Sequence, residues 1–168
     1  MNCLRCAKPE YCSELCKDHF IKYFYKKFKA HLARIKILKR SEEVNLKGKN
    51  KKLAEHLLLS LGDSLDVKFS ARGKEVRTHS MDYKVVNQLE GLMTLMKPII
   101  PSVLECYRLT EIEKFCELKR YEFEAEDYSK LSLRIMKEMD KLEIRKPNIY
   151  TSSYKILEKF YEALSKKI

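Results

Sequence analysis

Residues 3–36 of this 168-residue chain read CLRCAKPEYCSELCKDHFIKYFYKKFKAHLARIK. The stretch joins a segment dense in cysteine to a helical pattern in which large apolar side chains recur every four residues. Four of the six cysteines lie within the first sixteen residues, and so short a segment cannot bury a hydrophobic core of its own. The start of the chain has no apolar run of the signal-peptide type. We therefore expect a reducing compartment, where close cysteines favour a metal site over a disulfide.

Two ligand pairs stand in this segment. Cys3 and Cys6 are separated by two residues, as are Cys16 and His19. Cys12 lies between these two pairs. Zinc prefers four nitrogen or sulfur ligands in a tetrahedron, and a two-residue spacer lets two ligands bind the ion from one tight turn. Three thiolates and one imidazole leave no position for a catalytic water. The spacing predicts a structural Zn²⁺ site, at which metal binding and local folding are one event.

The same residues leave alternatives open. Cys12 could replace Cys16 or His19 as a ligand. An iron–sulfur cluster is a second alternative because four cysteines are available, although the histidine immediately before the helix favours zinc. Free thiols on a disordered tail are a third, which the paired short spacings disfavour.

An amphipathic helix is predicted from about Phe20 to Leu38. Its apolar stripe is formed by Phe20, Phe24, Phe28, Leu32, Ile21 and Ile35. No acidic residue occurs between positions 21 and 40. A helix whose polar face is simply exposed to water normally also contains glutamates, which form ion pairs with lysines four residues away. Lysines beside tyrosines can contact RNA phosphates and stack on unpaired bases. The predicted RNA-binding residues are Lys22, Lys26, Lys27, Lys29, Arg34, Lys36, Tyr23 and Tyr25.

The composition points to a polyanionic partner. Lys and Arg total 35 against 24 for Asp and Glu, which gives a formal net charge of +11 and a pI near 9.3. Such an excess favours nucleic acid first and an anionic membrane surface second. Hydrophobic residues make up 45%, which excludes a disordered chain. No run approaches the ~18 apolar residues needed to cross a bilayer, so we expect a cytoplasmic protein without a membrane partner.

The rest of the chain gives weaker patterns. Residues 39–52 are polar and contain a glycine, which predicts a linker or loop. Residues 92–100 are the best candidate for a buried strand, and Thr110–Glu113 has the form of a capping box. Further predicted elements are a helix over 51–61 ended by Gly62, short strands over 67–71 and 75–79, a helical stretch to Arg120, and amphipathic helices over 128–142 and 154–165.

Several stretches resemble the tRNA 2-thiouridine synthetases, PP-loop ATPases of the archaeal and eukaryotic-cytoplasmic tRNA thiolation type. Cys-Leu-Arg-Cys, followed by Cys16-Lys-Asp-His-Phe-Ile-Lys-Tyr-Phe, resembles the family's N-terminal zinc finger and the basic helix after it. Residues 48–63 look like a decayed copy of the family's Gly-His-Asn-Leu-Asp-Asp-Glu-Ala helix. Lys97-Pro98 with residues 111–123 resembles a strand and a helix of its C-terminal half, and residues 146–159 more faintly resemble its closing segment.

The departures from the family concern its catalytic parts. The family adenylates a tRNA uridine with a Ser-Gly-Gly-x-Asp-Ser loop that cradles phosphate, and this sequence has no such loop. Lys52 and Leu53 replace the acidic pair of the family's helix. The central Cys-x2-Cys that holds an iron–sulfur cluster in many members is absent, and Glu126 stands where the third cluster cysteine is expected. The resemblance implies a truncated member without the PP-loop.

Together these observations predict a helix-rich α+β protein in three parts. They are a zinc finger over 1–20, a basic amphipathic helix over 21–40, and a helix-rich remnant of the family's α/β PP-loop domain over 41–168. We expect a non-catalytic tRNA-binding protein related to the wobble-uridine 2-thiolation enzymes. It would act alone or as the partner of a catalytic PP-loop subunit, with self-association left open. The alternative is a zinc-stabilised adaptor that binds another protein. An enzyme is not predicted, since the sequence offers no ATP site.

Overall fold

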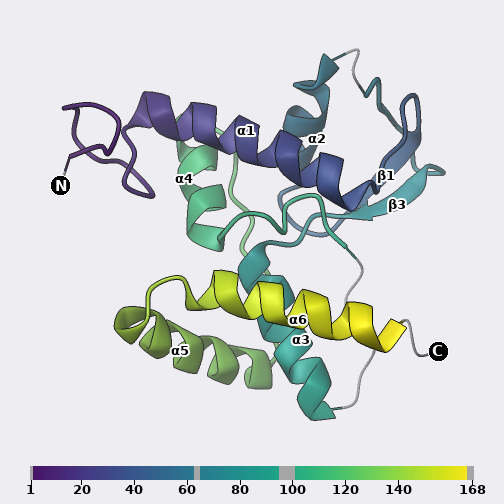
Figure 1. The fold of residues 1–168 in the computed structure, drawn as a ribbon. Coiled ribbons are helices and arrows are strands. Elements are labelled where there is room, and N and C mark those ends of the chain that lie inside the picture. Colours follow the sequence, from purple (N-terminus) through teal and green to yellow (C-terminus); the bar gives the residue numbers. More distant parts are fainter. Residues whose placement is uncertain (1, 63–64, 95–100, 166–168) are drawn as a thin grey trace.

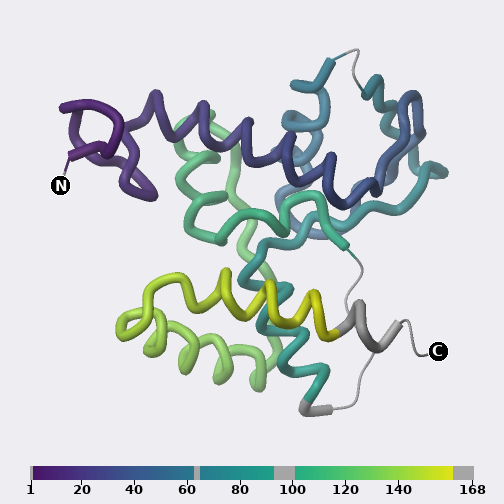
Figure 2. The backbone as a smooth tube through the Cα atoms, in the orientation of Figure 1, coloured from purple at the N-terminus to yellow at the C-terminus, as the bar shows by residue number. Residues whose placement is uncertain are grey.

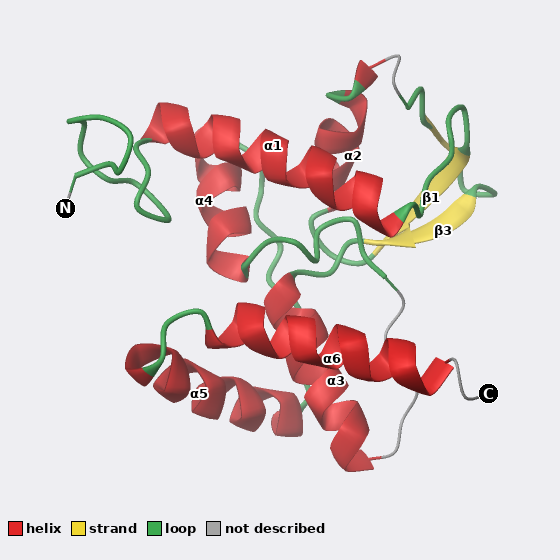
Figure 3. Ribbon diagram, in the orientation of Figure 1, coloured by secondary structure: helices red, strands yellow, loops and turns green. Residues whose placement is uncertain are grey.

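The computed structural model describes residues 2–62, 65–94 and 101–165. Helices and a small parallel sheet make a helix-rich α+β fold, which confirms the predicted class (Figure 1, Figure 3). Within these residues, no helix combines the length and apolar character needed to cross a membrane. The elements are α1 (Lys17–Ile35), β1 (Glu43–Lys47), α2 (Lys51–Leu59), β2 (Lys68–Phe69), β3 (Lys74–Arg77), α3 (Met81–Thr94), α4 (Leu109–Lys119), α5 (Lys130–Arg145) and α6 (Ile149–Ser165).

β1 is the central strand of a parallel sheet with the order β2-β1-β3. Parallel neighbours need a crossover connection, and α2 makes it between β1 and β2 while packing against β1. Val44 is fully buried and pairs with Phe69 on one side and Lys74 on the other. The two predicted short strands are therefore present, but they flank β1 instead of pairing with each other.

The buried face of α1 is aromatic. Phe20, Phe24 and Phe28 have no exposed surface. The Phe24 ring stacks between Tyr107, at a centroid distance of 3.8 Å, and Phe115 of α4, at 3.9 Å. Aromatic side chains bury large areas and prefer defined ring geometries, so these contacts fix the rotation of α1 about its axis. The predicted phenylalanine stripe is confirmed, although the helix begins and ends three residues earlier than expected.

α3, α5 and α6 pack around a second cluster of buried side chains, below α1, α2, α4 and the sheet in Figure 1 and Figure 2. These two groups of elements are the two halves of the fold, and the junction between them contains buried charged side chains. The carboxylate of Glu105, which is 1% exposed, accepts hydrogen bonds from the Lys84 ammonium (2.9 Å), the Tyr154 hydroxyl (3.0 Å) and the Ser102 N–H (2.8 Å). Removing one partner of a buried ion pair costs about 3–5 kcal/mol, so this junction holds the halves in one arrangement.

Three local predictions are wrong. Residues 39–52 are not a linker throughout, because β1 occupies their middle. Residues 92–94, predicted to begin a buried strand, are the last turn of α3, and 95–100 lie outside the described residues. The capping box of α4 forms two residues earlier than expected, where the Glu111 carboxylate accepts the Arg108 N–H at 2.9 Å.

Gly73 lies where the chain crosses the start of β1 on its way from β2 to β3. A Cβ atom there would lie 2.6 Å from both the carbonyl carbon of Glu43 and the nitrogen of Val44. These are backbone atoms of the central strand, which cannot rotate away as a side chain could. We predict that Gly73→Ala lowers the free energy of unfolding by about 3 kcal/mol, the upper end of the usual cost of overpacking. Urea denaturation of the variant and of the unmodified protein measures this change in the free energy of unfolding.

Gly62→Ala is the matched control. Gly62 has a φ of 53° and no neighbouring atom within 4 Å of its Cβ position. Alanine there costs only the strain of the left-handed conformation, about 1 kcal/mol. An equal loss of unfolding free energy in the two variants would contradict the close contact between Gly73 and the backbone of β1.

Candidate metal centre

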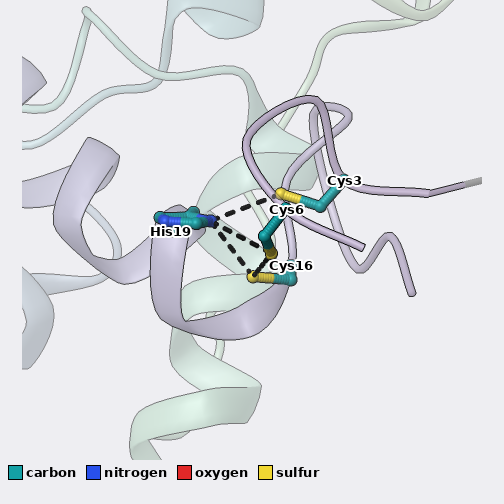
Figure 4. Close-up of side chains that lie close together, drawn as sticks. All are labelled: Cys3, Cys6, Cys16 and His19. Carbon is teal, nitrogen blue, oxygen red and sulfur yellow. Dashed lines mark hydrogen bonds between the residues drawn. The ribbon is translucent and has the colours of Figure 1, made fainter. Parts of the chain in front are cut away.

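Three cysteines and one histidine converge at the N-terminal end of the molecule (Figure 4). The Sγ atoms of Cys3, Cys6 and Cys16 and the Nδ1 atom of His19 all lie within 4.8 Å of one another. Nδ1 of His19 is 3.4 Å from the sulfur of Cys3, 3.6 Å from that of Cys6 and 3.4 Å from that of Cys16. The sulfurs of Cys6 and Cys16 are 3.7 Å apart. The structure thus brings together the four side chains that the sequence predicts as metal ligands.

The local backbone explains this convergence. Cys16 is the extended residue directly before α1, and His19 lies in the first helical turn, so their side chains meet on one side of the helix start. The N–H of Cys6 bonds to the carbonyl of Cys3 at 3.3 Å, which closes the tight turn between the first two sulfurs.

The separations fit one tetrahedral ion. Zinc–sulfur bonds of about 2.3 Å and zinc–nitrogen bonds of about 2.0 Å put two sulfurs about 3.8 Å apart and a sulfur and a nitrogen about 3.5 Å apart. The distances from His19 to the sulfurs and between Cys6 and Cys16 are close to these values. Burial raises the pKa of Cys3, but the N–H groups of Cys16 and Arg5 outweigh it and lower that pKa to about 6. The group could hold a metal ion and fills all four positions of a tetrahedral one.

Cys12 lies outside this group, with its sulfur 3.7 Å from the hydroxyl of Ser13. The segment around it packs on the body of the molecule. The Tyr11 hydroxyl donates to the carbonyl of Lys114 in α4 (3.0 Å), and buried Leu15 belongs to the same hydrophobic cluster as the α1 phenylalanines. The cysteine segment is therefore held by α4 as well as by α1.

The exposed lysines predicted to bind RNA form one stripe on α1. Lys22, Lys26 and Lys29 are exposed, and Lys36, the residue after the helix, continues their line. Their spacing puts them on the helix surface opposite the buried Phe24. We call these four residues the lysine stripe.

The other cations predicted for RNA lie at the edges of the buried face, where carboxylates hold them. The Lys27 ammonium is 2.8 Å from Glu111, and its side chain is 25% exposed. The Arg34 guanidinium is 3.2 Å from Glu158, and the Arg34 side chain remains 51% exposed. The structure therefore separates Lys27 and Arg34 from the lysine stripe.

The two predicted tyrosines are half-buried and have partners within the protein. The Tyr25 hydroxyl is hydrogen-bonded to Nε2 of His56 at 2.6 Å. The Tyr23 ring lies under the Lys27 ammonium, 5.0 Å from its centroid. Their rings are thus only partly available to an unpaired base.

No second group of three or more His, Cys, Asp or Glu side chains lies at metal-ligand spacing in the part of the chain that the structure describes. Glu126, at the position where the resemblance expects a cluster cysteine, is buried. Its carboxylate accepts the N–H and the hydroxyl of Ser80 (2.6 Å each) and the hydroxyl of Tyr128 (3.1 Å). This carboxylate holds the start of α3 and the segment before α5 together.

Comparisons with known proteins give matches among solved structures only. No protein-family profile matches the chain, and no curated protein is similar to it in sequence. Among solved structures, the chain is similar to the U34-tRNA thiolase NcsA from Methanococcus maripaludis, determined with its [4Fe-4S] cluster. The TM-score is 0.73 at 14% sequence identity, over 96% of this chain and 87% of that chain. At this identity the match shows the fold alone.

The ligand group predicts a measurable metal content. The purified chain should contain about one metal ion per molecule, because four ligands lie around one position. Cys16→Ser should lower this content strongly, since it removes one of the four ligands, whereas Cys12→Ser should leave it unchanged. Elemental analysis after gel filtration measures both. Loss of metal from Cys12→Ser, or full retention by Cys16→Ser, would indicate a different ligand set.

Proposed function

We propose that this chain is a non-catalytic tRNA-binding protein related to the enzymes of wobble-uridine 2-thiolation. The fold similarity to a U34-tRNA thiolase supports the relation. The observation that carries RNA binding is the lysine stripe, an exposed row of cations on a helix whose rotation is fixed by buried rings. The metal-binding segment stands directly at the start of the same helix.

The metal in this proposal is zinc. A zinc ion needs its four ligands around one point, and the His19 and cysteine atoms have that spacing. An iron–sulfur cluster binds its cysteines at different iron atoms, so its ligand sulfurs stand farther apart than the ligands of a single ion. Bound zinc would act as a structural crosslink. Cys3, Cys6, Cys16 and His19 would hold it and orient the segment before α1.

The absence of a catalytic role is supported by the sequence and by Glu126. The sequence lacks the Ser-Gly-Gly-x-Asp-Ser loop, and the hydrogen bonds of Glu126 give that carboxylate a structural role. In this proposal the chain is related to that family but does not itself carry the PP-loop. It would supply tRNA contacts alone or beside a catalytic PP-loop subunit.

The lysine stripe predicts salt-dependent binding. Each phosphate that a lysine neutralises adds about 0.7–0.9 to the slope of log affinity against log salt. The variant that carries Lys22→Glu, Lys26→Glu and Lys29→Glu together should lower this slope by about 2–3 and weaken tRNA binding more than tenfold at low salt. Fluorescence anisotropy with labelled tRNA across a salt series measures both quantities.

A matched triple variant separates the stripe from net charge. Lys130→Glu, Lys137→Glu and Lys155→Glu change three exposed lysines of α5 and α6 and shift the net charge equally. This control should retain most of the tRNA affinity. Equal weakening in both triple variants, or no binding by the unmodified chain at low salt, would count against the proposal.

The second candidate function is a zinc-stabilised adaptor for another protein. Exposed apolar side chains on α5 and α6 favour it, since Ile144 is 84% exposed and Ile156 67%. Scattered exposed apolar residues are normal on soluble proteins, so this observation is weaker than the lysine stripe. Co-purification of a protein partner without any affinity for tRNA would favour the adaptor.

A further inference from the structure

A groove lined by leucines opens beside the C-terminal end of α1, at the opposite end of this helix from the metal ligands. Four half-buried leucines form its floor. They pack on the main hydrophobic cluster from one side and stay partly exposed on the other. We call this surface the leucine groove, and its lining residues are Lys29, Leu32, Ala33, Lys36, Leu38, Leu61 and Leu65.

Backbone hydrogen bonds hold the walls of the leucine groove in place. The N–H of Ser41 donates to the carbonyl of Leu65 at 2.9 Å, which joins the segment after α1 to the segment before β2. The N–H of Lys36 donates to the carbonyl of Leu32 at 3.1 Å and ends α1 at the groove. The groove is therefore formed before any partner binds.

The size of the groove indicates the kind of occupant. Its volume is about 240 Å³, which lies below the range of about 300–1,000 Å³ that is typical of small-molecule sites. The leucines offer no hydrogen-bonding group and no flat ring for a base. Apolar surfaces rimmed by polar residues are typical of protein interfaces, where a few anchor side chains fill small pockets. The groove therefore suits an apolar side chain of another protein.

The rim of the groove carries positive charge. Lys29 and Lys36 are exposed, and within the described residues neither ammonium is paired with a carboxylate. Acids on the neighbouring segments already have partners. Glu42 lies 3.3 Å from the Lys74 ammonium, and the carboxylate of Asp66 accepts the hydroxyl of Ser41. Two cations beside an apolar floor complement carboxylates on either side of an apolar side chain.

The spacing of the rim fits a helix. Lys29 and Lys36 are two turns apart, about 10 Å along α1. Between them Ala33 is exposed, and so small a side chain lets a second helix approach closely, because the distance between helix axes depends on the side chains at the contact. A helix laid along α1 presents its own residues at the same two-turn spacing. Recognition of an amphipathic helix in a groove uses apolar anchors at helical spacing.

We propose that the leucine groove binds an acidic amphipathic helix of another protein. An apolar side chain of that helix fills the space over the leucines, and its carboxylates pair with Lys29 and Lys36. The groove is a different surface from the exposed apolar residues of α5 and α6. Because Lys29 and Lys36 also belong to the lysine stripe, the partner helix and tRNA exclude each other. Only this exclusion rests on the proposed function.

A labelled helical peptide of about 15 residues, with one central leucine between two glutamates two turns apart, is the probe. Fluorescence anisotropy with the full chain should show binding at low salt that weakens as salt is added. A peptide with serine in place of the leucine should bind about thirtyfold more weakly, the loss expected for a buried anchor. A peptide with glutamines in place of the glutamates should lose the salt dependence.

Two pairs of variants locate the contact. Ala33→Gln places a longer side chain in the groove and should weaken peptide binding by about tenfold or more, the scale of an overpacked contact. Ala30→Gln is its matched control, since Ala30 is exposed on the same helix outside the groove. Lys29→Glu with Lys36→Glu should weaken binding and remove its salt dependence, whereas Lys29→Arg with Lys36→Arg should retain the affinity.

Three outcomes would overturn the proposal. They are no peptide binding by the unmodified chain at low salt, equal effects of Ala33→Gln and Ala30→Gln, and binding of octanoate as tight as that of the peptide. The last result would make the groove a site for a small carboxylate. A single-stranded RNA whose binding is weakened by Ala33→Gln as much as that of the peptide would equally overturn it.

A competition experiment separates this proposal from the proposed function. Unlabelled peptide should displace labelled tRNA, and simultaneous binding of both would contradict the exclusion. Peptide binding without tRNA binding supports the groove and removes the proposed function. Binding of tRNA that depends on Lys22 and Lys26, with no peptide binding, does the reverse.

Discussion

The position of the Phe24 ring between Tyr107 and Phe115 sets the geometry of the N-terminal third of the protein. A helix can rotate about its axis until side chains fix it, and here successive buried rings do so. With α1 fixed, its opposite face presents the lysine stripe to solvent, and its first turn presents His19 to the cysteine loop. The metal-ligand group and the cationic surface are therefore two consequences of one packing arrangement.

The sequence predicts α1 and the ligand group well because both patterns are local. The phenylalanines repeat every four residues, and the ligand pairs have fixed short spacings. It does not predict β1 or α3, for physical reasons. β1 reads as polar because a small sheet buries only Val44 among its five residues. α3 buries Asp82, Lys84 and Gln88 beside its apolar residues, so its buried face does not look hydrophobic in the sequence. The ion-pair partners of Asp82 and Lys84, Arg108 and Glu105, come from distant positions.

The charge of α1 shows the same limit of local patterns. No acid occurs near Lys27 and Arg34 in the sequence, which suggests a uniformly cationic helix. The structure brings Glu111 and Glu158 to these two residues from 84 and 124 positions away. The Lys27–Glu111 pair is part of the packing because its side chains are mostly removed from water, whereas the Arg34 side chain stays 51% exposed. A charge count along a helix therefore overstates the number of cations that a polyanion can reach.

The two proposed contact surfaces offer different chemistry. The lysine stripe is a convex helix surface with long side chains, which suits phosphates and carries no information about bases. The leucine groove is concave and apolar, so it suits a protein side chain, and Lys29 and Lys36 at its rim belong to both surfaces. Neither surface uses the loop that activates ATP in the resembled family. In the proposed function, contacts with nucleic acid therefore come from residues outside any PP-loop.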